Sequence, residues 1–246
     1  MKVAVVGARG RMGSSVVEAV NNAADLELVA ALDADSELNE ENLHGAEVAV
    51  EFTVPSVTDG NVHRLLDAGV NVVVGTTGWT PERLGEVERH AKEVGKSVFI
   101  APNFSISAVL VMHFSKQAAA CFESVEVIEL HHPNKVDAPS GTALTTAQGI
   151  AEVRKAAGMT PCPDATENDP MGARGADVEG VRVHAVRLRG LNAHEEVVFG
   201  NPGEQLILRQ DSFDRASFMP GVLLAVRKVA QHPGLTFGLD SLLELS

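Results

Sequence analysis

The first hundred residues alternate between short apolar runs and segments in which apolar residues recur every three or four positions. The apolar runs indicate strands, at residues 3–6, 26–32, 47–52, 70–74 and 97–100. The helical spacing occurs between them, at 14–21, 61–68 and 81–93, and Pro81 suits the first turn of a helix. Apolar strands that alternate with helices predict an α/β domain with a Rossmann-like, doubly wound parallel sheet covered on both faces.

From about Ser105 the pattern changes. Helices are indicated at 106–122, 142–155 and 217–231, and half-exposed strands at 124–130, 181–188, 195–199 and 205–210. The segment 158–180 is rich in Pro, Gly and Asp and is predicted to be a loop. This succession predicts a second, α+β domain with a mixed or antiparallel sheet. We place the two domains at 1–104 and 105–211, followed by a C-terminal segment at 212–246.

Composition excludes several classes of function. The formal net charge of −13 over 246 residues argues against general binding to nucleic acid or to anionic membranes, which needs an excess of Lys and Arg. No apolar run approaches the length of a membrane span. Cys121 and Cys162 lack zinc-site spacing, so we expect no metal and a reducing compartment. The chain begins with a strand-like run and shows no signal peptide, so we expect a cytoplasmic protein.

A glycine-rich turn, Gly7-Ala-Arg-Gly-Arg-Met-Gly13, follows the first predicted strand and opens a helix. Glycines in this position let the backbone turn tightly and approach a pyrophosphate at the helix N-terminus. Asp33 ends the second predicted strand, 20 residues past Gly13, where a carboxylate can accept hydrogen bonds from ribose hydroxyls. These residues predict a dinucleotide site, with a plain strand–turn–helix as the alternative.

Further polar residues follow the later predicted strands. They are Thr53, the run Gly75-Thr-Thr-Gly78, and the run Ala101-Pro-Asn-Phe104. In an open α/β sheet, ligands bind at the carboxyl edge of the strands. Three such positions favour a nicotinamide dinucleotide lying along that edge, although each residue alone is also an ordinary cap.

The residues 131–143, His-His-Pro-Asn-Lys-Val-Asp-Ala-Pro-Ser-Gly-Thr-Ala, lie between a predicted strand and a predicted helix. Ser140 is suited to cap that helix, and the free backbone N–H groups at a helix start can hold an anion. Two imidazoles and an ammonium group lie beside this helix start. The segment therefore predicts a site that binds a carboxylate or phosphate and donates protons.

With its glycine-rich turn and its segment 131–143, the chain resembles the 4-hydroxy-tetrahydrodipicolinate (dihydrodipicolinate) reductases of the bacterial lysine and diaminopimelate pathway. The resemblance extends over essentially the whole chain, and the His-His-x-x-Lys-x-Asp-Ala-Pro-Ser-Gly-Thr segment carries it most specifically. It implies that His131 is the acid/base residue and that Lys135 donates a proton and holds a carboxylate. It also implies that His132, Gly141 and Thr142 bind substrate. The implied coenzyme-binding residues are Gly7, Ala8, Arg9, Gly10, Arg11, Met12, Asp33, Thr53, Gly75, Thr76, Thr77, Ala101, Pro102, Asn103 and Phe104.

The same resemblance implies a small dicarboxylate substrate, a homotetramer assembled through the second domain's sheet, and a C-terminal segment that packs on the first domain. Asp33 favours the free ribose hydroxyls of NADH. Arg9 and Arg11 are cations that can reach the 2′-phosphate of NADPH, or they are ordinary surface charges. We therefore predict use of both NADH and NADPH with a modest preference for NADH.

Two other functions remain open on the sequence. One is another two-domain dehydrogenase, acting for example on homoserine or a sugar, but the His-His-x-x-Lys segment is not typical of those enzymes. The other is a non-catalytic NAD(P)-sensing regulator of the same fold. The presence of His131, Lys135 and Thr142 favours an enzyme over a sensor.

Overall fold

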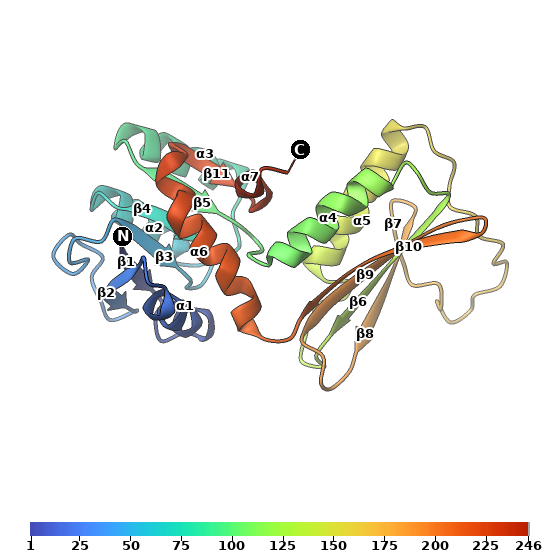
Figure 1. The fold of residues 1–246 in the computed structure, drawn as a ribbon, viewed down its shortest axis with the longest axis horizontal. Helices are drawn as coiled ribbons and strands as arrows, with labels where there is room; N and C mark the ends of the chain where they lie inside the picture. The colour runs from blue at the N-terminus through green and yellow to red at the C-terminus, as the bar shows by residue number, and fades with distance from the viewer. Residues whose placement is uncertain (246) are drawn as a thin grey trace. The chain divides into compact units, whose positions relative to one another are not determined.

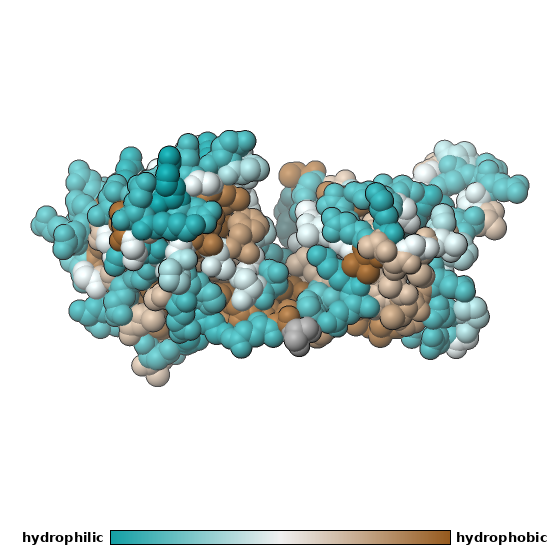
Figure 2. Space-filling view, turned by 90° about the horizontal axis from the view of Figure 1, so that it is seen from above, coloured by the Kyte–Doolittle hydropathy of each residue, from teal (hydrophilic) through white to brown (hydrophobic). Residues whose placement is uncertain are grey.

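The computed structural model describes residues 1–245, which form two compact units. Unit 1 comprises Met1–Ile106 together with the chain from Arg215 onward, and unit 2 comprises Ser107–Asp214. Each unit has its own sheet and its own hydrophobic core. Hydrophilic residues make up most of the visible surface of both units (Figure 2).

Unit 1 contains a parallel sheet of six strands (Figure 1). Its order is β11-β5-β4-β3-β1-β2, so β1 lies between β3 and β2, where the order of the strands reverses. The strands are β1 (Lys2–Val6), β2 (Glu27–Leu32), β3 (Val48–Glu51), β4 (Asn71–Val74), β5 (Ser97–Ile100) and β11 (Gly234–Phe237). The helices are α1 (Arg11–Asn22), α2 (Thr58–Asp67), α3 (Pro81–Glu93), α6 (Met219–Lys228) and the short α7 (Asp240–Leu243).

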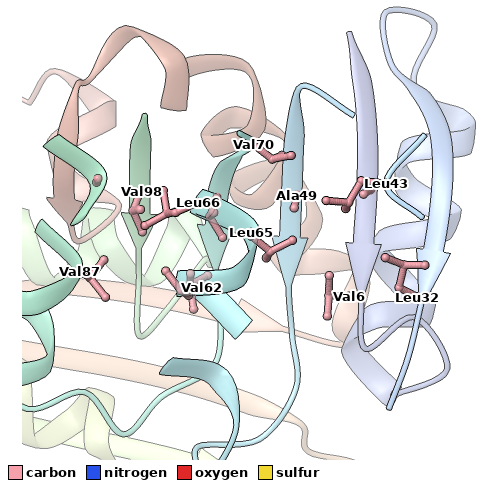
Figure 3. Packing of buried hydrophobic residues seen from close by; sticks show 14 of the residues in the cluster. Val6, Leu32, Leu43, Ala49, Val62, Leu65, Leu66, Val70, Val87 and Val98 are labelled. Atoms are coloured by element: carbon pink, nitrogen blue, oxygen red, sulfur yellow. The ribbon is translucent and has the colours of Figure 1, made fainter. Parts of the chain in front are cut away.

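Helices cover both faces of this sheet because the central strands are apolar on both sides. All four residues of β3 are buried, and so are three of the four in β4. Against one face pack α2 and α3 (Figure 3), and their buried residues include Val62, Leu65 and Val87. On the other face, α1 and α6 contact each other. The predicted Rossmann-like sheet is confirmed.

The C-terminal part of unit 1 differs from its prediction in three ways, the first being the short helix α7, which was not predicted. The expected helix at 217–231 is α6 flanked by two short 3-10 turns, Arg215–Phe218 and Val229–Gln231. Pro220 stands at the start of α6, where its missing N–H breaks no helical bond. The strand β11 was not predicted. It pairs in parallel with β5, which is distant in sequence. Four residues are too few to show a periodic pattern of apolar positions. Gly234 and Gly238, at its start and just after its end, have positive φ.

Unit 2 contains a mixed sheet of order β10-β9-β6-β8-β7, in which the neighbours β6 and β8 pair in parallel and the other neighbouring strands of residues 107–214 pair antiparallel. The strands are β6 (Ser124–His131), β7 (Ala176–Val178), β8 (Val181–Arg187), β9 (Ala193–Asn201) and β10 (Glu204–Ser212). The helices α4 (Ile106–Ala118) and α5 (Gly141–Ala156) contribute to its core. The predicted mixed α+β architecture is confirmed.

One element of unit 2 corrects the sequence prediction. The loop expected at 158–180 contains β7 near its end, which pairs antiparallel with β8 across a tight turn. Glu179 and Gly180 both have positive φ in that turn. A three-residue edge strand is too short to show an alternating pattern, so the surrounding Gly and Asp residues dominated the prediction. Within residues 1–245, no helix has the length and apolar character needed to cross a membrane.

Candidate functional site

The glycine-rich turn joins β1 to α1, and two of its glycines are required by the packing of the chain itself. Gly7 has φ of +81°, and a Cβ there would lie 2.2 Å from the carbonyl oxygen of Phe52 on the neighbouring strand end. A Cβ on Gly13 would lie 1.9 Å from the carbonyl oxygen of Gly7. These contacts bring the start of α1 close to the sheet edge, as a helix start that binds a pyrophosphate requires.

Two neighbouring cavities lie along this edge of unit 1. One has a volume of about 430 Å³ and is lined by residues that include Asp33, Leu38, Val57 and Arg64. The other has a volume of about 310 Å³ and is lined by Arg11, Met12, Pro55, Gly75, Thr76 and Thr77 among others. Both are lined by Gly10, Phe52 and Thr53, so they adjoin at the glycine turn. Two adjoining cavities on either side of a helix start fit an elongated dinucleotide.

Asp33 is held by the glycine turn. One carboxylate oxygen accepts the backbone N–H of Arg9 at 2.8 Å, and the other accepts that of Ala34 at 2.9 Å. These hydrogen bonds from Ala34 and Arg9 lower the pKa of Asp33, so the group is ionised at neutral pH. The guanidinium of Arg9 binds Asp35 at 2.5 Å and lies 3.5 Å from Asp33. Arg9 therefore contacts two carboxylates. The sequence analysis had considered only a contact with the 2′-phosphate of NADPH or an ordinary surface charge.

A buried carboxylate lies beneath the same edge. Glu51, at the end of β3, is fully buried and accepts hydrogen bonds from the hydroxyls of Thr58 at 2.8 Å and Thr76 at 2.7 Å. It also accepts from the hydroxyl of Thr53 and, at 3.2 Å, from the amide of Asn61. Glu51 thus connects the ends of β3 and β4 with the start of α2. Sequence reasoning gave Glu51 no role.

The run 101–104 follows β5 and reaches the same edge of the sheet, but its residues do not line either of the two cavities. Ala101 and Phe104 are buried, and the Phe104 ring lies against those of Phe52 and Phe99, at 5.7 and 5.9 Å between centroids. Pro102 is exposed and Asn103 is half-buried.

In unit 2, His131 ends β6 beside a second buried carboxylate. Its Nδ1 lies 2.5 Å from Oε2 of Glu129, which is fully buried. An ionised carboxylate only accepts hydrogen bonds, so Nδ1 carries a hydrogen and Nε2 is left for a ligand. Burial lowers the pKa of His131, although the hydrogen bond and negative charge of Glu129 act to raise it. Burial also acts to raise the pKa of Glu129, but its bonds with Arg187 and His131 outweigh this and lower it.

The other predicted residues of this site, which are His132, Lys135, Gly141 and Thr142, follow within eleven positions. Lys135 binds Asp137 at 2.7 Å. His132 has a buried Nδ1 without a hydrogen-bond partner within residues 1–245. Ser140 caps α5 as predicted, its hydroxyl accepting the N–H of Ala143 at 3.2 Å. Gly141 is exposed, and a Cβ added there would meet no atom within 4 Å. The chain's own packing therefore does not require glycine at this helix start, in contrast to Gly7 and Gly13.

Comparison with known proteins covers nearly the whole chain. The family model described as dihydrodipicolinate reductase, N-terminus, matches residues 1–104. The model described as dihydrodipicolinate reductase, C-terminus, matches residues 107–243. The chain belongs to the dihydrodipicolinate reductase family.

Individual relatives agree with this membership. A 4-hydroxy-tetrahydrodipicolinate reductase from Bifidobacterium longum subsp. infantis is 64% identical over 251 residues, which cover 100% of both chains. Another from Beutenbergia cavernae is 61% identical over 247 residues, covering 100% of this chain and 99% of the relative. Among solved structures, a dipicolinate-bound dihydrodipicolinate reductase from Paenisporosarcina sp. TG-14 matches with a TM-score of 0.88 and 39% identity, covering 98% of each chain. The family resemblance inferred from the sequence is confirmed.

This reductase contains functional candidates that sequence reasoning missed. The sequence analysis gave no role to Glu51, Glu129, Arg187 or Arg64. A detectable signal existed for the two glutamates. Glu51 ends an otherwise apolar strand, and Glu129 shares the core-facing side of β6 with Val125 and Val127. A carboxylate at a core-facing position needs buried donors, and such a position marks a hydrogen-bond network.

Reductases of this family use NAD(P)H. The residues of unit 1 fit such a coenzyme because an ionised acidic residue, a helix start and two adjoining cavities lie at one sheet edge.

Proposed function

We propose that this chain catalyses the NAD(P)H-dependent reduction of 4-hydroxy-tetrahydrodipicolinate to tetrahydrodipicolinate in lysine and diaminopimelate biosynthesis. The observation that carries the proposal is the segment 131–142, on which a partly buried imidazole, a lysine and a capped helix start occur together. Relatives at 64% and 61% identity carry this enzyme name over their full length. The dipicolinate-bound relative supports a small cyclic dicarboxylate as the ligand class.

Two separate elements suit the two carboxylates of this substrate. Lys135, with His132 beside it, supplies positive charge for one of them. The N–H groups at the start of α5, at Gly141 and Thr142, suit the other, because a helix N-terminus favours an anion. Support comes from Gly141, whose missing side chain leaves the helix start open to a ligand. The buried, unpartnered Nδ1 of His132 within residues 1–245 is further support, since a buried polar atom needs a partner.

The conversion replaces a hydroxyl group on the ring by hydrogen, so it takes up one hydride and one proton and releases water. The protein must supply the proton. His131 is suited to this role because Nδ1 is held by Glu129, which leaves Nε2 to carry a proton toward the substrate. Lys135 is the second proton donor of the site. Its ion pair with Asp137 at 2.7 Å places the ammonium group on the loop between β6 and α5.

The edge of unit 1 would hold the coenzyme. The turn from Gly7 to Met12 would bind the pyrophosphate at the start of α1, and Asp33 the adenosine ribose. Residues Thr53, Gly75 to Thr77 and Ala101 to Phe104 would bind the remainder. When bound, NAD(P)H supplies the hydride. Glu51 would keep Thr53 and Thr76 in place through the hydrogen bonds that it accepts.

We further propose that both coenzymes are used, with a modest preference for NADH. Asp33 is ionised, which favours free ribose hydroxyls over a 2′-phosphate. Arg9 already faces Asp33 and Asp35, so its charge is largely balanced, and Arg11 is the second cation of the turn. A ratio of kcat/KM for NADH over NADPH beyond about a hundredfold in either direction, roughly 3 kcal/mol, would contradict this proposal.

A coupled assay tests the reaction. Pyruvate and aspartate semialdehyde are combined with a dihydrodipicolinate synthase, and oxidation of NADH or NADPH is followed after this protein is added. We expect oxidation that depends on the synthase and is lost in Lys135→Ala. Tight coenzyme binding without turnover would point instead to a regulator that senses NAD(P).

We also propose that the chain assembles into a homotetramer. The sequence features favour a cytoplasmic protein, and the family resemblance implies a homotetramer. Sedimentation velocity tests the oligomeric state. A species of about four times the 26.0 kDa chain mass is expected, and a monomer at micromolar concentration would contradict it.

A further inference from the structure

Glu129 and Arg187 form a buried ion pair in the sheet of unit 2. Both guanidinium Nη atoms of Arg187 donate to the two carboxylate oxygens of Glu129, each at 2.8 Å. The Glu129 side chain is fully buried, and that of Arg187 is mostly buried. A bidentate pair of this kind is rigid because its planar groups allow one relative orientation. We refer to it as the Glu129–Arg187 pair.

This pair contacts the segment 131–140 at its start, middle and end. At the start, Glu129 accepts from Nδ1 of His131. In the middle, Arg187 donates to the backbone carbonyl of Asp137 at 2.8 Å. At the end, the backbone N–H of Ser140 donates to Glu129 at 3.1 Å. One ion pair therefore fixes the imidazole, the loop that carries Lys135, and the residue that caps α5.

The carboxylate of Glu129 is saturated by these contacts. It accepts two hydrogen bonds from Arg187, one from His131 and one from Ser140, which uses the four acceptor positions of an ionised carboxylate. Replacing the carboxylate by an amide introduces two N–H groups where only donors surround it. Such a change leaves at least one buried donor without an acceptor.

We propose that Glu129 and Arg187 are positioning residues for the reaction, which set the orientation and protonation of His131 and hold the Lys135 loop and the helix start in register with it. The part of this inference that concerns catalysis rests on the proposed function. The contacts themselves do not depend on the substrate.

The charges around His131 predict how its pKa changes when Glu129 or Arg187 is replaced. The groups that face the imidazole are Glu129 on β6, Arg187 on β8, and Lys135 on the loop, where Asp137 balances the lysine. Glu195 on β9 lies opposite Glu129 in the strand pairing. The negative charge of Glu129 raises the pKa of His131, whereas the positive charge of Arg187 lowers it. Removing one or the other must therefore move the His131 pKa in opposite directions.

The experiment measures the His131 pKa by NMR titration of ¹⁵N-imidazole-labelled protein, with the signal assigned from its absence in His131→Gln. We expect a lower pKa in Glu129→Gln and a higher pKa in Arg187→Met. In the coupled assay, we expect Glu129→Gln to lower kcat/KM by at least about tenfold and to raise KM for the dicarboxylate. The limb of the pH–rate profile at which activity falls should move to lower pH, because less His131 carries the proton to be donated.

Glu195→Gln is the matched control, because Glu195 is another buried glutamate of the same sheet, whose carboxylate accepts a hydrogen bond from the Thr146 hydroxyl instead. It should leave the activity close to that of the natural chain. Glu129→Asp keeps the charge and should preserve the His131 pKa better than Glu129→Gln. If the amide prevents folding, Arg187→Met carries the titration test alone. A His131 pKa that is unchanged in Arg187→Met and in a folded Glu129→Gln, or equal losses of activity in Glu195→Gln and Glu129→Gln, would overturn the proposal. If the natural chain shows no turnover, the proposed function fails, while the titration still decides whether the pair controls His131.

Discussion

The hydroxyl of Thr76 donates a hydrogen bond to the buried carboxylate of Glu51 at 2.7 Å and accepts the backbone N–H of Thr53 at 2.8 Å. One side chain thereby joins the ends of two adjacent parallel strands, β3 and β4, where the sheet meets the proposed coenzyme site. Because of these two hydrogen bonds, the shape of the carboxyl edge of the sheet depends on the polar network around Glu51.

Thr76→Val tests this network. The substitution keeps the shape of the side chain but leaves Glu51 with one donor fewer and removes the acceptor of the Thr53 N–H. We expect a loss of about 1–3 kcal/mol in the free energy of unfolding, because buried polar groups lose partners, and a higher KM for NAD(P)H. Urea denaturation and steady-state kinetics measure the two effects. Thr77→Val, at an exposed position, should change the unfolding free energy by less than about 0.5 kcal/mol.

His131→Gln tests the proton donor. Glutamine can keep a hydrogen bond to Glu129 but cannot deliver a proton at neutral pH. We expect kcat to fall by about 10²–10⁴-fold, the range for loss of an acid/base group, while KM changes far less. Steady-state kinetics in the coupled assay measure both constants. A decrease in kcat much smaller than about 10²-fold would show that His131 is not the acid.

Gly141→Ala tests the anion site at the start of α5. The new methyl group meets no protein atom within 4 Å, so stability should not fall. It would lie beside the N–H groups that are proposed to hold a carboxylate, and we expect about a tenfold higher KM for the dicarboxylate, or roughly 1.4 kcal/mol. Gly85→Ala in α3 is the control, since its Cβ also meets nothing within 4 Å. An unchanged KM in Gly141→Ala would remove Gly141 from the site.

Glu195 makes stability depend on pH. Burial raises its pKa to about 7, and the hydrogen bond from Thr146 only partly opposes this. The folded state therefore holds a proton that the unfolded state releases near the ordinary value of 4.5. Because the folded state binds more protons between these values, its stability falls as pH rises from about 4.5 to 7.

Glu195→Gln replaces this group by a permanently neutral one. Relative to the natural chain, the variant should gain up to about 3 kcal/mol in unfolding free energy between pH 5 and pH 8. Denaturation at both pH values measures the difference. A stability difference that is the same at pH 5 and pH 8 would mean that Glu195 is ionised in the folded protein throughout this range.

The glycine turn at 7–13 and the proposed catalytic segment at 131–142 could be found from the sequence because both are local. Glycines after a first strand, a serine before a helix and an aspartate after a second strand each act within a few residues of their position. Their element types followed from periodicity, with boundaries within a few residues for most strands and helices. The roles of Glu51 and Glu129 were not accessible in this way, since a glutamate near the end of a strand has the same local pattern whether it is solvated or buried.

The sequence by itself therefore determined the apolar strands, the amphipathic helices, the glycine turn and the family of this protein. Only the tertiary structure decided which donors surround the two buried carboxylates and where the short strands β7 and β11 lie. Arg187 is 58 positions from Glu129, and Thr76 is 25 from Glu51. The physical reason is that periodicity records which face of an element is buried, whereas a buried charge is stabilised by specific partners that the folding of distant segments brings within hydrogen-bond distance.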